Sequence, residues 1–446
     1  MQSSARALWG SRLGFILASA GSAVGLGALW KFPYMAGTNG GSAFILPYIL
    51  LTVFIGFIVL LIEMALGRSG RAGAAHTLRL YGGKGWGVIG FTSVLAGFLI
   101  LAFYQVIGGW CLNYLVDAIQ GKGIITDTTQ LGAYFDGFIG NGTRVCSMQL
   151  SFLALTVLIV SFGLTNGVER IAKVLMPTLF LLMCIIIVRG LTLPGAMSGV
   201  EFMFKFDASS FTRESLMNAL GFSFFSLSLG SGTMMNYGSY ISDRINLTTS
   251  VAWISFLAII SSLLGGLMVM PTVFAVGLDP AAGPGLTFVT MPAVFAHLPF
   301  SHFFAVVLYL CLVVAALTTS ISILQMSAQY LIDEFHCSRA FSISLNTLVL
   351  IVLGILCSLS FGVLSDWTIM GKTFFDLLDF LTSNFGMPLG AMGIAIVGGY
   401  LAWPKMQEQL QMNANLPGWI LAIIKASIRF LAPSVIVIIA VAGLMN

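Results

Sequence analysis

Charged side chains are scarce in this chain. Only 8% of its 446 residues are Asp, Glu, Lys or Arg, whereas 58% are hydrophobic. A soluble domain has roughly a quarter of its residues charged. The composition therefore predicts an integral membrane protein, with the lipid bilayer as a partner and no nucleic acid bound.

Residue types that carry enzymatic chemistry are also sparse. The four histidines lie at loops or at the ends of apolar runs, away from Asp, Glu and Cys. The six cysteines are scattered, in neither a disulfide framework nor a zinc-binding spacing. No metal cluster or nucleophile-base pair is indicated, so we do not expect an enzyme.

What the chain has is long apolar runs, each able to span a bilayer core that needs about 20 helical residues. The alternating pattern of a membrane β-barrel is missing, which predicts an all-α membrane protein. No cleavage site follows the first run, so we expect it to be retained. We count eleven predicted spans: 12–36, 41–69, 86–118, 147–164, 168–190, 213–241, 246–276, 302–335, 339–360, 373–402 and 420–445.

Basic residues gather at the span ends that share a side with the N-terminus. By the positive-inside rule, this side faces the cytoplasm of a cell (inner) membrane. An odd number of spans then places Asn446 outside the cytoplasm. The basic residues on this side are Arg6, Arg12, Arg68, Arg71, Arg79, Lys84, Arg170, Lys173, Arg244, Arg339, Lys405, Lys425 and Arg429.

Two predicted spans carry glycine where a membrane helix should be regular. The first has Gly21, Gly25 and Gly27, and the sixth has the run 230–232, about 205 positions later. A helix broken at this depth exposes backbone groups, which are tolerated only against protein or a wet cavity. A single glycine-rich span would more often serve helix packing, and a channel filter would repeat around one axis.

Two breaks in register instead predict an inverted repeat with a solute site between its halves. We expect discontinuous helices 1 and 6 to open two five-helix repeats, over residues 1–190 and 191–403. Residues 404–446 add a linker and an eleventh helix. All three parts form one transporter domain.

Several segments, in this order, resemble the neurotransmitter:sodium symporter family, particularly its short bacterial amino-acid transporters. They are RLGFILASAGSAVGLGALWKFPY, NGGSAFILPY, FYQVIGGW, FFSLSLGSG and AALTTSISILQ. The resemblance covers essentially the whole chain and is weakest in the last two spans. It implies sodium-coupled uptake of a solute by alternating access.

Sodium prefers hard oxygen ligands, and Thr318 and Thr319 place two hydroxyls on one face of the eighth span. The resemblance implies a sodium ion held there by these side chains and by the carbonyls of Gly21, Val24 and Ala315. Without the resemblance, hydrogen bonds from each threonine to its own helix would be the more frequent arrangement.

The family's other sodium site is altered. Ala28 stands where members usually carry Asn, and Leu257 or Ala258 stands where the seventh helix supplies Asn or Asp. Phe222 replaces a usual Gln, which leaves Ser226 from that group. We therefore expect one sodium site to be kept and the other lost or remodelled. Chloride dependence stays open, because Ser261 or Ser262 could bind an anion.

The resemblance implies a zwitterionic amino acid as substrate. Its carboxylate would meet the amides of Leu26 and Gly27, at a positive helix end, and the hydroxyl of Tyr104. The substrate amino group would meet carbonyls of Ala23, Phe225 and Ser226 and the hydroxyl of Ser228. The side chain would be bounded by Ile100, Phe225, Ser231, Ser320 and Ile323.

Charged residues near the break match the family's gates. Lys31 and Asp379 correspond to an outer gate pair, although Lys loses the bidentate geometry of the usual Arg. The inner gate would comprise Arg6, Trp9, Ser239, Tyr240 and Asp333. Glu63, deep in the second span, is expected to hydrogen-bond the unwound backbone.

The preferred interpretation is a secondary transporter that imports an amino acid with sodium. A sodium-dependent amino-acid or amine sensor, which binds without net transport, is the alternative. The sequence favours neither a particular amino acid nor a particular oligomeric state.

Overall fold

In this computed structural model, the described residues are 7–122, 128–281, 288 and 300–445. Their regular structure is helical apart from one isolated β-bridge between Ile369 and Lys372. The prediction of an all-α fold is confirmed.

The helices follow the predicted spans closely. The first half contains α1 (Arg12–Ala23), η1 (Gly27–Lys31), α2 (Phe32–Thr38), α3 (Ser42–Leu51), η2 (Thr52–Gly56), α4 (Phe57–Gly70), α5 (Ala74–Gly82), α6 (Lys84–Ile119), α7 (Thr128–Ile139), α8 (Gly142–Ser161), η3 (Leu164–Glu169) and α9 (Arg170–Leu191). The second half contains α10 (Ala196–Phe204), η4 (Ala208–Ser210), α11 (Arg213–Ser226), α12 (Thr233–Gly238), α13 (Leu247–Val276), α15 (Ser301–Phe335), α16 (Arg339–Leu359), α17 (Phe374–Leu381), η6 (Thr382–Gly386), α18 (Met387–Ile396), η7 (Val397–Leu401), α19 (Trp403–Gln411), α20 (Gly418–Ala426), η8 (Ser427–Leu431) and α21 (Ala432–Met445).

By length and hydropathy, nine helices of the described chain could cross a membrane, and a bent pair at 12–38 makes ten. The remaining predicted span, 213–241, is divided into α11 and α12, which have 14 and 6 residues. Each piece alone is too short to cross a bilayer. The difference from the expected eleven spans therefore lies at the second break.

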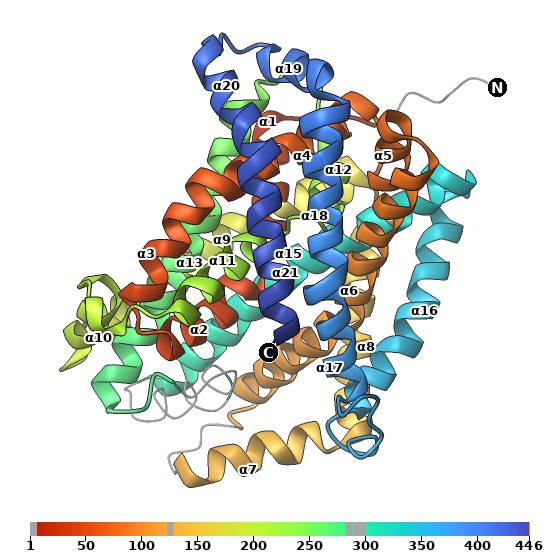
Figure 1. The fold of residues 1–446 in the computed structure, drawn as a ribbon. Helices are drawn as coiled ribbons and strands as arrows, with labels where there is room; N and C mark the ends of the chain where they lie inside the picture. Colours follow the sequence, from red (N-terminus) through yellow and green to blue (C-terminus); the bar gives the residue numbers. More distant parts are fainter. Residues whose placement is uncertain (1–6, 123–127, 282–287, 289–299, 446) are drawn as a thin grey trace.

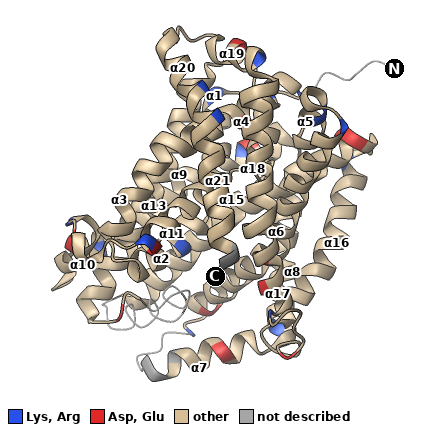
Figure 2. Cartoon of the chain, in the orientation of Figure 1, with Lys and Arg blue, Asp and Glu red and all other residues tan. Residues whose placement is uncertain are grey.

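The helices form one elongated body with two opposite faces (Figure 1). We call the end that holds α5 and α19 the N-terminal face, and the end that holds α7 and α10 the opposite face. Most charged side chains lie toward these two ends, with a broad uncharged band between them (Figure 2). This distribution suits a body that crosses a bilayer.

Short helices lie in the segments between the predicted spans. They are α5, α7, α10 and α19, and none is long enough to span a membrane. The connection between the predicted spans 246–276 and 302–335 lies largely outside the described residues.

The first break separates α1 from the π-helical turn η1. α1 ends at Ala23, and the helix axis bends by 47° before continuing from Gly27 to Thr38. A π-helical turn of this kind occurs frequently at functional sites. The helix is therefore interrupted where Gly21, Gly25 and Gly27 cluster.

The second break, residues 227–232, needs glycine at two positions. Gly230 and Gly232 both have φ +76°, a left-handed conformation that residues with a Cβ rarely adopt. A Cβ on Gly230 would also lie 2.2 Å from the carbonyl oxygen of Met387. The unwound segment consequently lies directly against the start of α18.

Candidate substrate and sodium site

The two helix breaks, after α1 and after α11, are in contact. The Ser228 hydroxyl donates a hydrogen bond of 3.2 Å to the carbonyl oxygen of Ser22, from the other broken helix. A pocket of about 50 Å³ lies at this junction. Its lining residues are Ser22, Ala23, Gly25, Gly27, Ile100, Tyr104, Phe225, Ser228, Ser231, Thr233, Thr319, Ile323 and Met387.

One side of the pocket offers hydrogen-bond donors. The backbone N–H of Leu26 donates to the Tyr104 hydroxyl oxygen at 2.9 Å, which fixes that hydroxyl beside the break. Phe225 covers Gly27 closely, since a Cβ on Gly27 would lie 2.8 Å from its Cε1 atom. Helix amides beside a tyrosine hydroxyl can bind a carboxylate.

The pocket is largely apolar, with several hydroxyls, and its described lining is uncharged. Of the described residues that line it, none is Asp, Glu, Lys or Arg. The Ser22 side chain is 2% exposed, and its hydroxyl has no hydrogen-bond partner among the described residues. A buried hydroxyl without a partner is costly unless a ligand or water meets it.

Oxygen atoms from α1 and α15 converge beside this pocket. Thr319 Oγ1 lies 3.2 Å from the carbonyl oxygen of Ser22 and 3.4 Å from that of Gly21. Thr318 Oγ1 instead donates to Ala315 in its own helix, at 2.9 Å. Hydroxyl and carbonyl oxygens of this kind are the ligands that a hard cation prefers, so the residues present fit a sodium ion.

Aromatic side chains fill the region of the altered ion site. The Phe222 ring lies 5.1 Å from Tyr48, 5.6 Å from Phe32 and 5.8 Å from Phe44, measured between ring centroids. The Tyr48 hydroxyl lies 3.1 Å from the Ser262 hydroxyl. The Ser226 and Thr52 hydroxyls also lie beside Tyr48, whereas Ala28 adds no side-chain oxygen.

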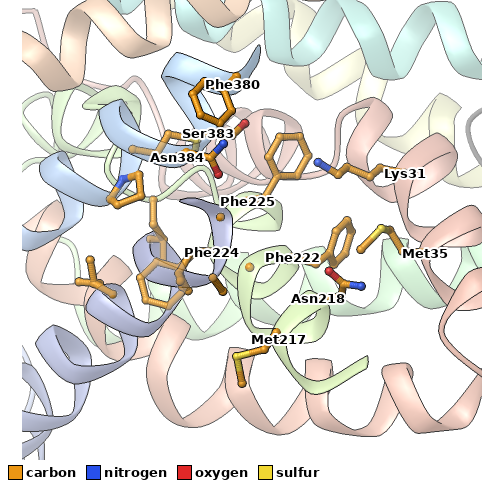
Figure 3. Close-up of a pocket in the computed structure, with 18 of the residues that line it drawn as sticks. Lys31, Met35, Met217, Asn218, Phe222, Phe224, Phe225, Phe380, Ser383 and Asn384 are labelled. Atoms are coloured by element: carbon orange, nitrogen blue, oxygen red, sulfur yellow. The ribbon is translucent and has the colours of Figure 1, made fainter. Parts of the chain in front are cut away.

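A larger cavity of about 400 Å³, lined by Lys31 and Phe225 among others, adjoins this pocket (Figure 3). Phe225 and Met387 line both spaces. Lys31 lines the cavity, and its ammonium lies 4.4 Å from the Phe225 ring centroid. No ion pair joins Lys31 to Asp379 in this structure, and Asp379 Oδ1 accepts a hydrogen bond from the Ser383 hydroxyl.

The path toward the N-terminal face is closed. The Trp9 indole N–H donates to the carbonyl oxygen of Tyr237 at 3.0 Å, and the Trp9 ring packs edge-on against Tyr237 and Tyr240. Asp333 Oδ2 accepts a hydrogen bond from the Gly73 backbone N–H at 2.9 Å, and Ser239 is fully buried. Arg6 lies outside the described residues.

Glu63 of α4 supports the second break. Its side chain is fully buried, and Oε2 accepts a hydrogen bond of 3.2 Å from the backbone N–H of Gly230. This bond satisfies one of the backbone groups that unwinding exposes.

Eight of the eleven residues predicted for the substrate line the pocket. The other three are Leu26, whose N–H bonds Tyr104, and the buried residues Ser226 and Ser320. Ser22, Gly25, Thr233 and Met387 also line it and were not predicted. Ser22 and Gly25 lie inside the glycine-marked break, which could have pointed to them, whereas Met387 belongs to a span of weak resemblance.

Two broken helices that meet at an uncharged pocket, with a cavity on one side and close packing on the other, are typical of a secondary transporter. The family model for the sodium:neurotransmitter symporter family matches residues 6–130 and 129–446. The chain belongs to this family. It is therefore a multi-pass membrane transporter coupled to sodium, and not an enzyme.

Known proteins resemble the chain over most of its length. It is 42% identical to an uncharacterized sodium-dependent transporter, YhdH, of Bacillus subtilis, over 87% of this chain and 86% of that protein. An uncharacterized sodium-dependent transporter of Haemophilus influenzae is 34% identical over 98% of each chain. The crystal structure of MhsT in complex with L-phenylalanine has a TM-score of 0.90 and 38% identity, covering 98% of this chain and 100% of that one.

Proposed function

We propose that the protein imports a zwitterionic amino acid together with one sodium ion. The observation that carries the proposal is the pairing of Thr319 with the carbonyls of the first break, 3.2 and 3.4 Å away. It supports a retained ion site between α1 and α15. The ligands would be the carbonyls of Gly21, Val24 and Ala315 with the hydroxyls of Thr318 and Thr319.

The second ion site is proposed to be lost. A bound sodium ion needs several oxygens to replace its water. Ala28 and Leu257 have no side-chain oxygen, and Phe222 packs among other rings. These substitutions support one ion per transported solute.

The pocket suits an amino acid with an apolar side chain. The carboxylate would bind the amides of Leu26 and Gly27 and the Tyr104 hydroxyl. The amino group would bind the carbonyls of Ala23, Phe225 and Ser226 and the hydroxyl of Ser228. Ile100, Ile323 and Met387 supply an apolar wall, and Ser231 adds a hydroxyl. Ser320 is buried outside the lining in this structure and would bound the side chain only after a rearrangement. L-phenylalanine bound to the structurally similar MhsT supports this substrate class.

Access would alternate between the two faces by rocking of one helix bundle against the other. The cavity at Lys31 and the packed contacts of Trp9 support a conformation open only to the opposite face. Lys31 with Asp379, and Arg6 with Trp9, Ser239, Tyr240 and Asp333, would close the two sides in turn. The N-terminal face is proposed to be cytoplasmic, in the cell (inner) membrane.

Accumulation in sealed vesicles tests the proposal against a sensor that binds without transport. Purified protein in proteoliposomes, given an inward sodium gradient, is expected to concentrate a radiolabelled amino acid. A matched potassium gradient is the control. Sodium-dependent binding in detergent without accumulation in vesicles would favour the sensor.

A further inference from the structure

A carboxylate held at the first break would lack a positive side chain in the pocket itself. The described lining residues provide only backbone amides and hydroxyls. An anion removed from water is costly unless it is hydrogen-bonded and compensated by opposite charge. Besides the substrate's own ammonium and the proposed sodium ion at Thr319, any further positive charge must come from just beyond the lining.

Lys31 is the basic side chain closest to this point along the broken helix. The π-helical turn η1 begins at Gly27, whose amide would bind the carboxylate, and ends at Lys31. Both residues lie against the same ring. The Lys31 ammonium is 4.4 Å from the Phe225 centroid, and a Cβ on Gly27 would lie 2.8 Å from Phe225 Cε1.

Lys31 forms no ion pair with another described residue. A salt-bridged lysine would have little attraction left for a ligand. Its one described partner is the face of Phe225, which also lines the pocket.

The other lysine in the cavity is placed differently. The Lys372 ammonium lies 4.6 Å from the Phe380 ring centroid, on the segment before α17. Phe380 lines the cavity but not the pocket (Figure 3). Both lysines line the same cavity and contact an aromatic ring. Lys31 belongs to the turn that follows the first break, whereas Lys372 does not.

We propose that Lys31 supplies the counter-charge of the substrate carboxylate. The inference rests on the proposed function, because it needs an anionic group at Gly27. The long side chain of Lys31 could carry its ammonium past the edge of Phe225 to the carboxylate. Alternatively, the ammonium attracts the carboxylate across the apolar ring, where solvent screens the two charges weakly. Ala28 and Phe222 remove ligands of the second sodium ion. Lys31 would thereby provide the positive charge that this ion would have carried.

A double-mutant cycle between Lys31 and the carboxylate tests this role. Dissociation constants are measured in detergent at saturating sodium, with L-phenylalanine first and the other natural amino acids as further probes. The second ligand is the carboxamide of the amino acid that binds, which keeps its shape and removes its negative charge. The proteins are wild type, Lys31→Gln, Lys31→Arg and, as the matched control, Lys372→Gln.

We expect Lys31→Gln to weaken amino-acid binding by about tenfold or more and carboxamide binding by less than about threefold. Lys31→Arg and Lys372→Gln should stay within about threefold of wild type for both ligands. If the carboxamide binds too weakly to measure, the amino-acid affinities of the three variants alone decide whether Lys31 supplies the counter-charge.

Equal weakening of both ligands by Lys31→Gln would assign Lys31 to gate closure only and overturn the inference. An amino-acid affinity unchanged in Lys31→Gln, or a loss as large in Lys372→Gln, would also overturn it. If the wild-type protein binds no amino acid in sodium, the proposed function itself fails. That result appears before any variant is compared.

Discussion

Thr319 of α15 and Gly21 of α1 are joined across 298 residues of sequence, because the Thr319 hydroxyl donates to the Gly21 carbonyl oxygen at 3.4 Å. The same hydroxyl lies 3.2 Å from the carbonyl of Ser22. A regular helix would consume these carbonyls in its own hydrogen bonds. The break after Ala23 leaves them able to bind a cation together with Thr319.

Replacing Thr319 by valine should weaken sodium activation. The change keeps the shape of the side chain but removes one hard oxygen from the proposed site. We expect the sodium concentration for half-maximal amino-acid binding to rise by about tenfold or more.

Thr156→Val is the matched control for this prediction. Thr156 is also buried in a membrane helix, but its hydroxyl donates to Phe152 of its own helix. Sodium activation should be unchanged in this variant. Equal effects of the two substitutions would place the sodium ion elsewhere.

Gly25→Ala should abolish binding of both sodium and amino acid. A Cβ at position 25 would lie 2.0 Å from Thr319 Oγ1 and 2.7 Å from the Tyr104 hydroxyl oxygen. Either group would have to leave its place. Gly85→Ala, where a Cβ would meet no atom within 4 Å, is the control. Wild-type affinity in Gly25→Ala, measured by equilibrium binding, would contradict the site.

Glu63 should matter for stability through its bond to Gly230. Glu63→Ala leaves a buried backbone N–H without a partner, which costs about 1–3 kcal/mol. The melting temperature should fall by several degrees in detergent. Glu63→Gln retains an acceptor oxygen and should fall less, and the exposed Glu201→Gln should not change it. Equal melting temperatures for Glu63→Ala and wild type would show that Glu63 does not support the break.

Chloride removal should have little effect. The rings of Phe222, Phe32 and Phe44 pack around Tyr48, so an anion there would lose its hydration against apolar rings. Replacing chloride by gluconate at constant sodium should change initial uptake by less than about twofold. Loss of uptake in gluconate would point instead to an anion bound by Tyr48 and Ser262.

The sequence predicted those parts of the fold that a single physical constraint determines, such as the length of a membrane helix. Long apolar runs located the membrane helices, and glycine located both breaks. The pieces α5, α7, α10 and α19 were missed because they are too short for the hydrophobic signal of a span. The second break was expected at 230–232, but unwinding begins at Leu227, which no glycine marks.

The two interrupted spans and the resemblance pointed to several residues that the structure brings together. Ala23, Gly27, Tyr104, Phe225 and Ser228 line one pocket, and their role in binding stays a prediction. Met387 was missed, because α18 reaches the pocket only through tertiary packing of its first residue on Gly230. The unpaired state of Lys31 and Asp379 likewise depends on the conformation and leaves no trace in the sequence.

The number of sodium ions carried with each amino acid distinguishes a transporter with one ion site from a transporter with two. With an inward tenfold sodium gradient and a potential of 100 mV, one ion sustains about 500-fold accumulation of a neutral solute. Initial fluxes of radioactive sodium and labelled amino acid, measured in the same proteoliposomes, give the ratio. The account predicts one sodium ion for each amino acid, and a ratio of two would contradict it.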